Sequence, residues 1–203
     1  MSIFATVVKW KINAMLNKEF YFKNGLIYGS INIIYLMITY VMGLDVMISY
    51  YNIGLSFIVG LGLMVFMGTQ VRKELGGYMT MSEGFKNIMV IYALGAFLYV
   101  AFNHILATVI DPALPGKMAE ATLEKTMSLM ESMGLPEDQL EESYDQMNTE
   151  IQKSMADAYT TIGFIRTYLT TVVFGAIGAV IGAAITKKVN PNPFAADQNT
   201  LHE

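Results

Sequence analysis

The amino-acid sequence predicts an all-α, polytopic membrane protein with four transmembrane helices and an extracytoplasmic acidic helical hairpin between the third and the fourth. Four apolar runs each reach the length of about 20 residues that a helix needs to cross a hydrocarbon core. Hydrophobic residues make up 54% of the 203 residues and charged residues only 15%, against about 25% in soluble domains. The acidic residues are concentrated in one polar insert. The lipid bilayer is therefore the expected environment, and no nucleic-acid partner is expected.

Residues 1–23 form a basic amphipathic segment that precedes the first apolar run. Lys9, Lys11 and Lys18 alternate with apolar pairs at helical spacing, and Trp10 lies among them. The lysines follow the apolar stretch, which is the wrong order for a signal peptide. The pattern predicts an interfacial helix in the cytoplasmic headgroup layer, with its lysines near anionic lipid. A partly ordered tail is the alternative.

Residues 24–110 contain three predicted transmembrane helices. The first runs from Asn24 to Met42, and a turn at Gly43 leads into the second, from Val46 to Thr69. The third runs from Asn87 to Ile110, and it stops at Asp111-Pro112 because proline restricts the residue before it. The first two spans are expected to form a tight hairpin.

The fourth span and its flanks occupy residues 161–188, and residues 189–203 form a tail that we expect to be disordered. Small residues recur every fourth position in the first and fourth spans, which allows close helix packing in lipid. The glycines predicted to pack in this way are Gly25, Gly29, Gly175, Gly178 and Gly182.

Four polar side chains inside the predicted spans are candidates for function. They are Asn32, Asn103, His104 and Arg166. Polar groups are costly in a bilayer and often mark substrate or ion pathways, although hydrogen bonds between helices (for Asn32) and snorkelling to the interface (for Arg166) are the favoured explanations. His104 is the only histidine outside the C-terminal tail, and there is no cysteine, so we expect no catalytic residue set, metal site or cofactor.

The connection between the second and third spans is rich in turn and capping residues. Gly76 and Gly77 supply a turn, and Thr80 and Glu83 have the spacing of a capping box. The stretch lacks the spacing of a phosphate-binding loop. A structural role is expected for this cytoplasmic loop motif, which also includes Arg72, with a functional contact as the alternative.

Residues 111–160 form the polar insert, with eleven acidic residues against three lysines. Two helices are predicted, Lys117 to Met133 and a second one that opens at Pro136. The apolar stripe of the second helix continues in register into the fourth span, so we expect this helix and the fourth span to be continuous. No calcium-loop pattern is present. The carboxylates are interpreted as a solvated face, and the methionine stripes as either the contact between the two helices or a partner-binding groove.

The basic residues predict the orientation, because lysine and arginine are enriched in cytoplasmic loops. Nine of them fall on one side of a four-span topology and four on the other. Both termini are therefore expected in the cytoplasm, with the acidic insert outside.

Several of these features together resemble one family. They are the stretch R-K-E-x-G-G-Y-x-T-x-S-E-G-F-K from Arg72 to Lys86, a third span that ends in Asp111-Pro112, an acidic insert with Gly134-Leu135 before its second helix, and a glycine-rich last span that closes on Lys187-Lys188. The chain thus resembles the uncharacterised DUF4199 membrane proteins of Bacteroidota. That resemblance implies the inner membrane of a Gram-negative bacterium and implies no activity.

The expected function is a non-enzymatic assembly, scaffold or accessory subunit, either as a homo-oligomer or with a membrane or envelope protein as partner. A small transporter or ion-conducting protein is the alternative, based on the four intramembrane polar residues. No acidic residue lies at the centre of a span to relay protons. An enzyme is the least favoured class, because no nucleophile with a base and no preformed ligand set is apparent.

Overall fold

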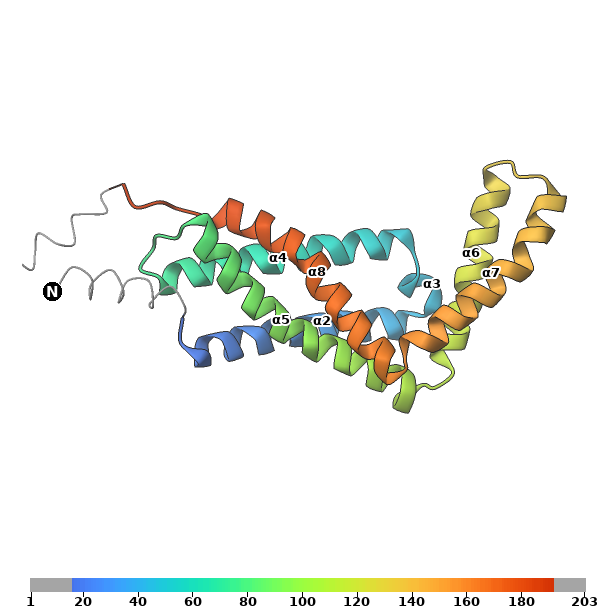
Figure 1. Cartoon of the computed structure of the whole chain (residues 1–203), viewed down its shortest axis with the longest axis horizontal. Coiled ribbons are helices and arrows are strands. Elements are labelled where there is room, and N and C mark those ends of the chain that lie inside the picture. The colour runs from blue at the N-terminus through green and yellow to red at the C-terminus, as the bar shows by residue number, and fades with distance from the viewer. Residues whose placement is uncertain (1–15, 192–203) are drawn as a thin grey trace, which may run out of the picture.

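The computed structural model describes residues 16–191, and within them a bundle of four long helices carries a helical hairpin that extends from one end (Figure 1). All four long helices are long and apolar enough to cross a membrane. They are α2 (Lys18–Met42), α4 (Tyr50–Glu74), α5 (Met81–Ile105) and α8 (Thr161–Thr186). The prediction of an all-helical chain with four candidate spans is therefore confirmed.

The first span begins earlier than the sequence pattern indicated. Helix α2 starts at Lys18 rather than at Asn24, because the Asn17 side chain accepts a hydrogen bond from the Glu19 amide and caps the helix there. The last residues of the proposed interfacial segment thus belong to the span. Residues 1–15 and the tail from 192 onward lie outside the described residues, so the interfacial helix and the disordered tail stay predictions.

A short helix separates the first two spans. Gly43 has φ +104°, a conformation that favours glycine, and ends α2. It leads into α3 (Leu44–Met47), after which the Ser49 side chain caps α4. The second span is thus shifted from its predicted start at Val46 to Tyr50, and it runs on to Glu74.

The third span ends in one turn of π-helix before the hairpin begins. Helix α5 passes into η1 (Leu106–Ile110), and the chain then turns at Asp111. The hairpin consists of α6 (Leu114–Ser132) and α7 (Glu137–Ala158), which pack along each other. Gly134, with φ +82°, ends the first of them as predicted.

The prediction that the second hairpin helix continues into the fourth span is wrong. Helix α7 ends at Ala158 and α8 begins at Thr161, with the Thr160 side chain accepting from the Gly163 amide. The chain folds back so closely here that a Cβ at Gly163 would lie 2.0 Å from the Asp157 carbonyl oxygen. The cap and this glycine create an elbow, which redirects the chain between the hairpin and the membrane span.

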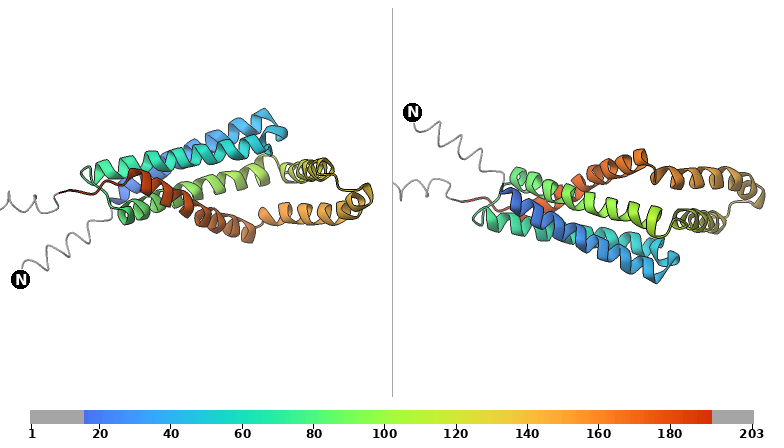
Figure 2. Two further views of the ribbon diagram at one scale, coloured as in Figure 1. Left: turned by 90° about the horizontal axis from the view of Figure 1, so that it is seen from above. Right: turned by 90° about the horizontal axis from the view of Figure 1, so that it is seen from below.

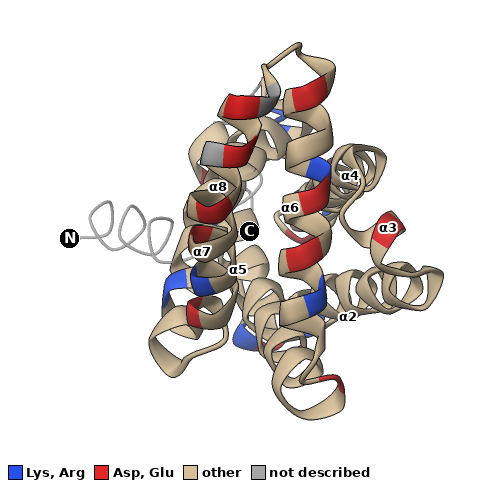
Figure 3. Cartoon of the chain, turned by 90° about the vertical axis from the view of Figure 1, so that its right-hand side faces the viewer, with Lys and Arg blue, Asp and Glu red and all other residues tan. Residues whose placement is uncertain are grey.

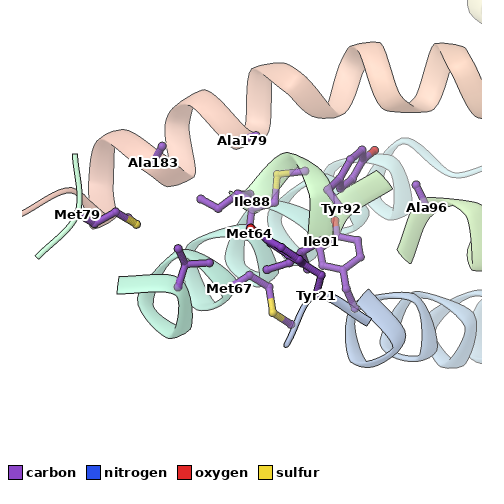
Figure 4. Packing of buried hydrophobic residues seen from close by; sticks show 12 residues of the cluster. Tyr21, Met64, Met67, Met79, Ile88, Ile91, Tyr92, Ala96, Ala179 and Ala183 are labelled. Carbon is purple, nitrogen blue, oxygen red and sulfur yellow. The ribbon is translucent and has the colours of Figure 1, made fainter. Parts of the chain in front are cut away.

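Helix α5 is the centre of the bundle. It packs against α2 on one side and α8 on the other, and α4 lies against both α8 and α5 (Figure 2). The core near the N-terminal end of α5 is filled by methionine, isoleucine, tyrosine and alanine (Figure 4). Outward side chains such as Ile58 and Val173 are 66% and 69% exposed, as expected for surfaces that face lipid.

Candidate functional site

Helices α2 and α5 approach each other through glycines on both sides. A Cβ at Gly95 would lie 2.9 Å from the Gly25 carbonyl oxygen and 3.0 Å from the Gly29 amide. A Cβ at Gly29 would in turn lie 2.9 Å from the Gly95 carbonyl. Two backbones thus contact each other directly, a geometry that small residues allow between helices in a membrane.

The predicted packing glycines of α8 face two neighbouring helices. Gly175 lies against the ring of Tyr92 on α5, whereas Gly178 and Gly182 lie against Met64 on α4. Since the Met64 side chain is flexible, its contact with Gly178 is more adaptable than the backbone contact between α2 and α5.

The four intramembrane polar candidates occupy three separate places. Asn32, on α2, donates from Nδ2 to the Tyr28 carbonyl at 2.8 Å and lines a cleft of about 400 Å³ between α2, α4 and α8. We call this space the mid-membrane cleft. Its other polar groups include the Tyr28 hydroxyl and Ser56, and its walls include Phe57 and Phe174. The cleft therefore combines an apolar lining with a few polar atoms.

Asn103 and His104 lie together at the far end of α5, beside the elbow that joins α7 to α8. They line a small cavity of about 100 Å³ with Tyr159 and Phe164. The His104 ring lies 5.5 Å from the Phe164 ring and 6.3 Å from the Tyr159 ring, measured between centroids. Burial raises the pKa of the Tyr159 hydroxyl, and a hydrogen bond with the Asn103 side chain offsets part of that rise. This cluster joins the span to the elbow.

Arg166 does not join this cluster. It is exposed on α8 and lines a shallow groove of about 520 Å³ together with Glu150, Lys153 and Asp157 of α7. Thr167 lines both this groove and the cavity beside His104, so the two adjoin at the elbow. The arginine thus faces the hairpin and its carboxylates rather than the interior of the bundle.

The loop between α4 and α5 forms the opposite end of the bundle. Arg72 donates from Nη1 to the Thr186 carbonyl at 3.2 Å, which joins α4 to the end of α8. Met79 and Lys188 exchange two backbone hydrogen bonds of 2.8 and 2.9 Å, so the chain beyond α8 pairs with this loop. Gly76 and Gly77 both have positive φ, and they form the turn.

The capping box predicted at this end is formed by Thr80 and Glu83. The Glu83 amide donates to the Thr80 hydroxyl while the Glu83 carboxylate accepts from the Thr80 amide at 2.8 Å, which confirms the capping box. The Tyr21 hydroxyl donates to Asn87 Oδ1, which joins α2 to α5. These contacts give the loop motif a structural explanation.

The hairpin carries an open groove between α6 and α7. Its volume is about 740 Å³, and we call it the hairpin groove. Helix α6 contributes Glu120, Leu123, Glu124, Met127, Ser128 and Glu131, and α7 contributes Leu140, Tyr144, Asn148 and Gln152. Helix α7 has no fully buried residue among those whose side chains are described. The two helices therefore contact each other along one seam and leave the groove open.

The hairpin is attached to the bundle through α6. Lys125 Nζ donates to the Asp45 carbonyl at 3.1 Å, which ties α6 to α3. Asp111 accepts from the Tyr40 hydroxyl at 3.2 Å and pairs with Lys117 at 3.5 Å. Within residues 16–191, no group of three histidine, aspartate or glutamate side chains is arranged to hold a metal ion.

Comparison with known proteins identifies the family. Residues 23–188 match the model of the family described as Protein of unknown function (DUF4199). The chain belongs to this family. The match runs from near the start of α2 to just beyond α8, so it includes the bundle and the hairpin. Comparisons with curated proteins and with solved structures give no match.

In this DUF4199 member, sequence reasoning missed three features of the arrangement. Gly95 is the residue of α5 that contacts the α2 backbone. It was missed because no second small residue lies four positions away from it, so it forms no GxxxG pattern. The bond between Tyr21 and Asn87 joins residues 66 positions apart, which no local pattern indicates. The elbow did leave a signal, because Thr160 precedes an apolar run as an N-cap residue does.

Proposed function

We propose that this DUF4199 protein is a non-enzymatic membrane protein that acts as an assembly, scaffold or accessory subunit, with α6 and α7 as its docking element. The observation that carries the proposal is the hairpin groove on a helical pair that projects beyond the spans (Figure 1). A pair of helices that leaves one face of its apolar seam open is suited to receive a further element.

The proposed location is the bacterial inner membrane, with both termini in the cytoplasm and the hairpin outside. Charge supports this orientation. The end of the bundle away from the hairpin carries the basic residues Lys18, Lys23, Arg72, Lys73, Lys86, Lys187 and Lys188. Acidic residues gather instead on the hairpin (Figure 3). Cytoplasmic ends of membrane proteins are enriched in lysine and arginine, so the basic end is assigned to the cytoplasm.

Orientation is tested with single cysteines, because the chain has no native cysteine. In intact spheroplasts, Glu141→Cys should react with a membrane-impermeant maleimide, and Gly77→Cys should react only after the membrane is permeabilised. The opposite labelling pattern would overturn the orientation, and labelling of both from outside would overturn the four-span arrangement.

Docking through the hairpin is tested by photo-crosslinking in the native cell. A photoreactive amino acid at Tyr144, which lines the groove, should form one discrete adduct, and the same group at Leu129, outside the groove, should not. The mass of the adduct distinguishes a second copy of the chain from a different protein. Equal, diffuse labelling at both positions, or no adduct at Tyr144, would contradict the docking function.

The mid-membrane cleft favours a small transporter or ion-conducting protein as the second candidate. Tyr28 and Asn32 of α2 and Ser56 of α4 bring polar atoms into a cleft between candidate spans, where few such groups are tolerated without a function. Purified protein in liposomes should then conduct protons or potassium, followed with a pH-sensitive or potential-sensitive dye, and Asn32→Leu should abolish the flux. Rates equal to those of empty liposomes would exclude this candidate for both ions.

A further inference from the structure

We infer that the hairpin groove binds a basic amphipathic helix of a partner protein. The inference rests on the proposed docking function and names the partner's chemistry. An amphipathic helix in an apolar groove is a common mode of protein recognition, in which apolar anchors recur at helical spacing. The groove fits this mode because it is long and open and lies between two helices.

The walls of the groove differ in chemistry. On α6, Glu120, Glu124 and Glu131 line it at positions i, i+4 and i+11, which places the three carboxylates on one side of the helix. On α7, the lining residues Asn148 and Gln152 are uncharged. A bound helix would therefore meet negative charge along one flank and neutral polar groups along the other.

The floor of the groove is apolar. Its apolar lining consists of Leu123 and Met127 of α6 and Leu140 and Tyr144 of α7. Leu123 is only 5% exposed, whereas Tyr144 is 46% exposed and available to a ligand. Methionine adapts its shape to varied partners, and tyrosine is enriched among residues that dominate binding energy. The floor thus offers apolar contact and one large aromatic anchor.

Charge determines which helix fits. Helices α6 and α7 together carry ten acidic residues against three lysines, so the whole hairpin attracts a cationic partner and repels an anionic one. The three wall carboxylates would pair with lysine or arginine side chains at matching positions along one flank of the partner's apolar stripe. From Glu120 to Glu131 the wall extends about 16 Å, which corresponds to a partner helix of three turns or more.

The occupant is a different protein rather than a second copy of this chain. Of the eleven lysine and arginine residues in the described part of the chain, four lie on the hairpin or beside it, and the other seven gather at the end of the bundle opposite the hairpin. Four candidate spans separate that end from the groove. A second copy in the same membrane and the same orientation would present its own acidic hairpin to the groove, and like charges disfavour that contact.

Binding is measured with a defined probe and the full chain in zwitterionic nanodiscs. The probe is a fluorescent leucine–lysine amphipathic helix of about 18 residues, or five turns. It should bind the protein-containing nanodiscs above the level of empty ones, and a peptide of the same composition in scrambled order should not. Binding should weaken as salt is raised, because exposed charges are screened within about 10 Å at 0.1 M salt.

Matched variants locate the binding surface. The triple change E120Q, E124Q and E131Q should weaken peptide binding about tenfold, since it removes the charged wall. The control D138N, E141Q and D145N removes the same charge from exposed positions of α7 outside the groove, and it should change the affinity less than about threefold. Tyr144→Ala, which keeps every charge, should also weaken binding about tenfold.

Equal losses in the two triple variants, or no loss with Tyr144→Ala, would overturn the inference, because the attraction would then be unspecific. Helical content and melting of each variant, measured in the same nanodiscs, exclude unfolding as the cause. The proposed function is judged separately by the photo-crosslink at Tyr144. A discrete adduct with a protein that has no basic amphipathic helix would preserve the docking function and refute the inference.

Discussion

The bundle and the hairpin are both built of packed helices, yet they are held together in different ways. In the bundle, the α2 and α5 backbones touch through Gly25, Gly29 and Gly95, and polar contacts such as Arg72 with the Thr186 carbonyl join the helix ends. In the hairpin, α7 has no fully buried residue among its described side chains, and α6 and α7 together carry ten acidic residues and three lysines. The stability of the bundle therefore depends on the close packing of its helices, whereas the hairpin keeps surface that a partner could contact.

The environment explains this difference. In lipid, burying apolar surface between helices gains no hydrophobic free energy, because lipid tails are equally apolar. Helix association therefore depends on close packing and on satisfied polar groups. In water, a two-helix pair is stabilised by the apolar area that it buries, and a pair on its own buries little. The comparison makes predictions that distinguish the two regions.

The largest effect is expected where the two backbones meet. Gly95→Leu should destabilise the bundle by about 3 kcal/mol, because the new side chain must displace the α2 backbone rather than a flexible neighbour. Thermal unfolding of the protein in detergent or nanodiscs measures the loss. Gly62→Leu is the matched control: an added Cβ meets nothing within 4 Å there, so stability should be unchanged. Similar losses in both variants would show that helix propensity or lipid contact, not backbone approach, is responsible.

The next effect tests whether the hairpin unfolds separately from the bundle. Leu123→Ala removes a nearly buried side chain from the seam of α6 and α7, and it should destabilise the hairpin by about 2 kcal/mol. Hydrogen exchange should increase within α6 and α7 while the melting of the bundle stays the same. Leu129→Ala, at a position that is 44% exposed, should change neither. A parallel loss of bundle stability in Leu123→Ala would mean that the two regions form one cooperative unit.

A smaller effect is expected at the basic end of the bundle. Arg72→Met leaves the Thr186 carbonyl without its charged donor and should cost about 1.5 kcal/mol. Lys73→Met removes the same charge from the adjacent exposed position, so it serves as the control and should be neutral. Unfolding by denaturant in matched detergent measures both variants. If the two variants lose the same stability, the net charge and not the hydrogen bond is what matters.

The smallest effect concerns the elbow between the two regions. The pKa of Tyr159 is raised in the folded protein, so the unfolded chain releases this proton more readily as pH increases. The contribution of protonated Tyr159 to the free energy of unfolding is therefore fully present below the ordinary tyrosine pKa of about 10, and it is lost as pH increases above that value. Stability measured between pH 9 and 11 should therefore fall less steeply in Tyr159→Phe than in the wild type. An identical slope would contradict burial of the hydroxyl.

The sequence predicted the spans well because apolar length is a property of each segment alone. All four runs are helices of sufficient length, and the Thr80 and Glu83 spacing correctly marked the start of α5. The same local reasoning failed at Thr160, where an unbroken apolar stripe suggested one helix and a cap with a glycine made two. Periodicity reports which face is apolar, and it does not report where the backbone turns.

The candidate residues were less predictable, because their neighbours come from distant parts of the chain. Asn103 and His104 meet Tyr159 more than 50 positions away, and Arg166 lies on a different surface of the elbow. Asn32 is separated from all three. Their polarity identified them in the sequence, but only the arrangement of the helices decides which of them share a site.

The pairing of Met79 with Lys188 has a practical consequence for reporters attached to this protein. Because two backbone hydrogen bonds hold Lys188 beside the α4–α5 loop, the chain just after α8 is fixed at the basic end of the bundle. A fluorescent or enzymatic tag placed there is kept away from the hairpin by the whole thickness of the bundle. A reporter inserted directly after Lys188 therefore leaves the hairpin groove unobstructed.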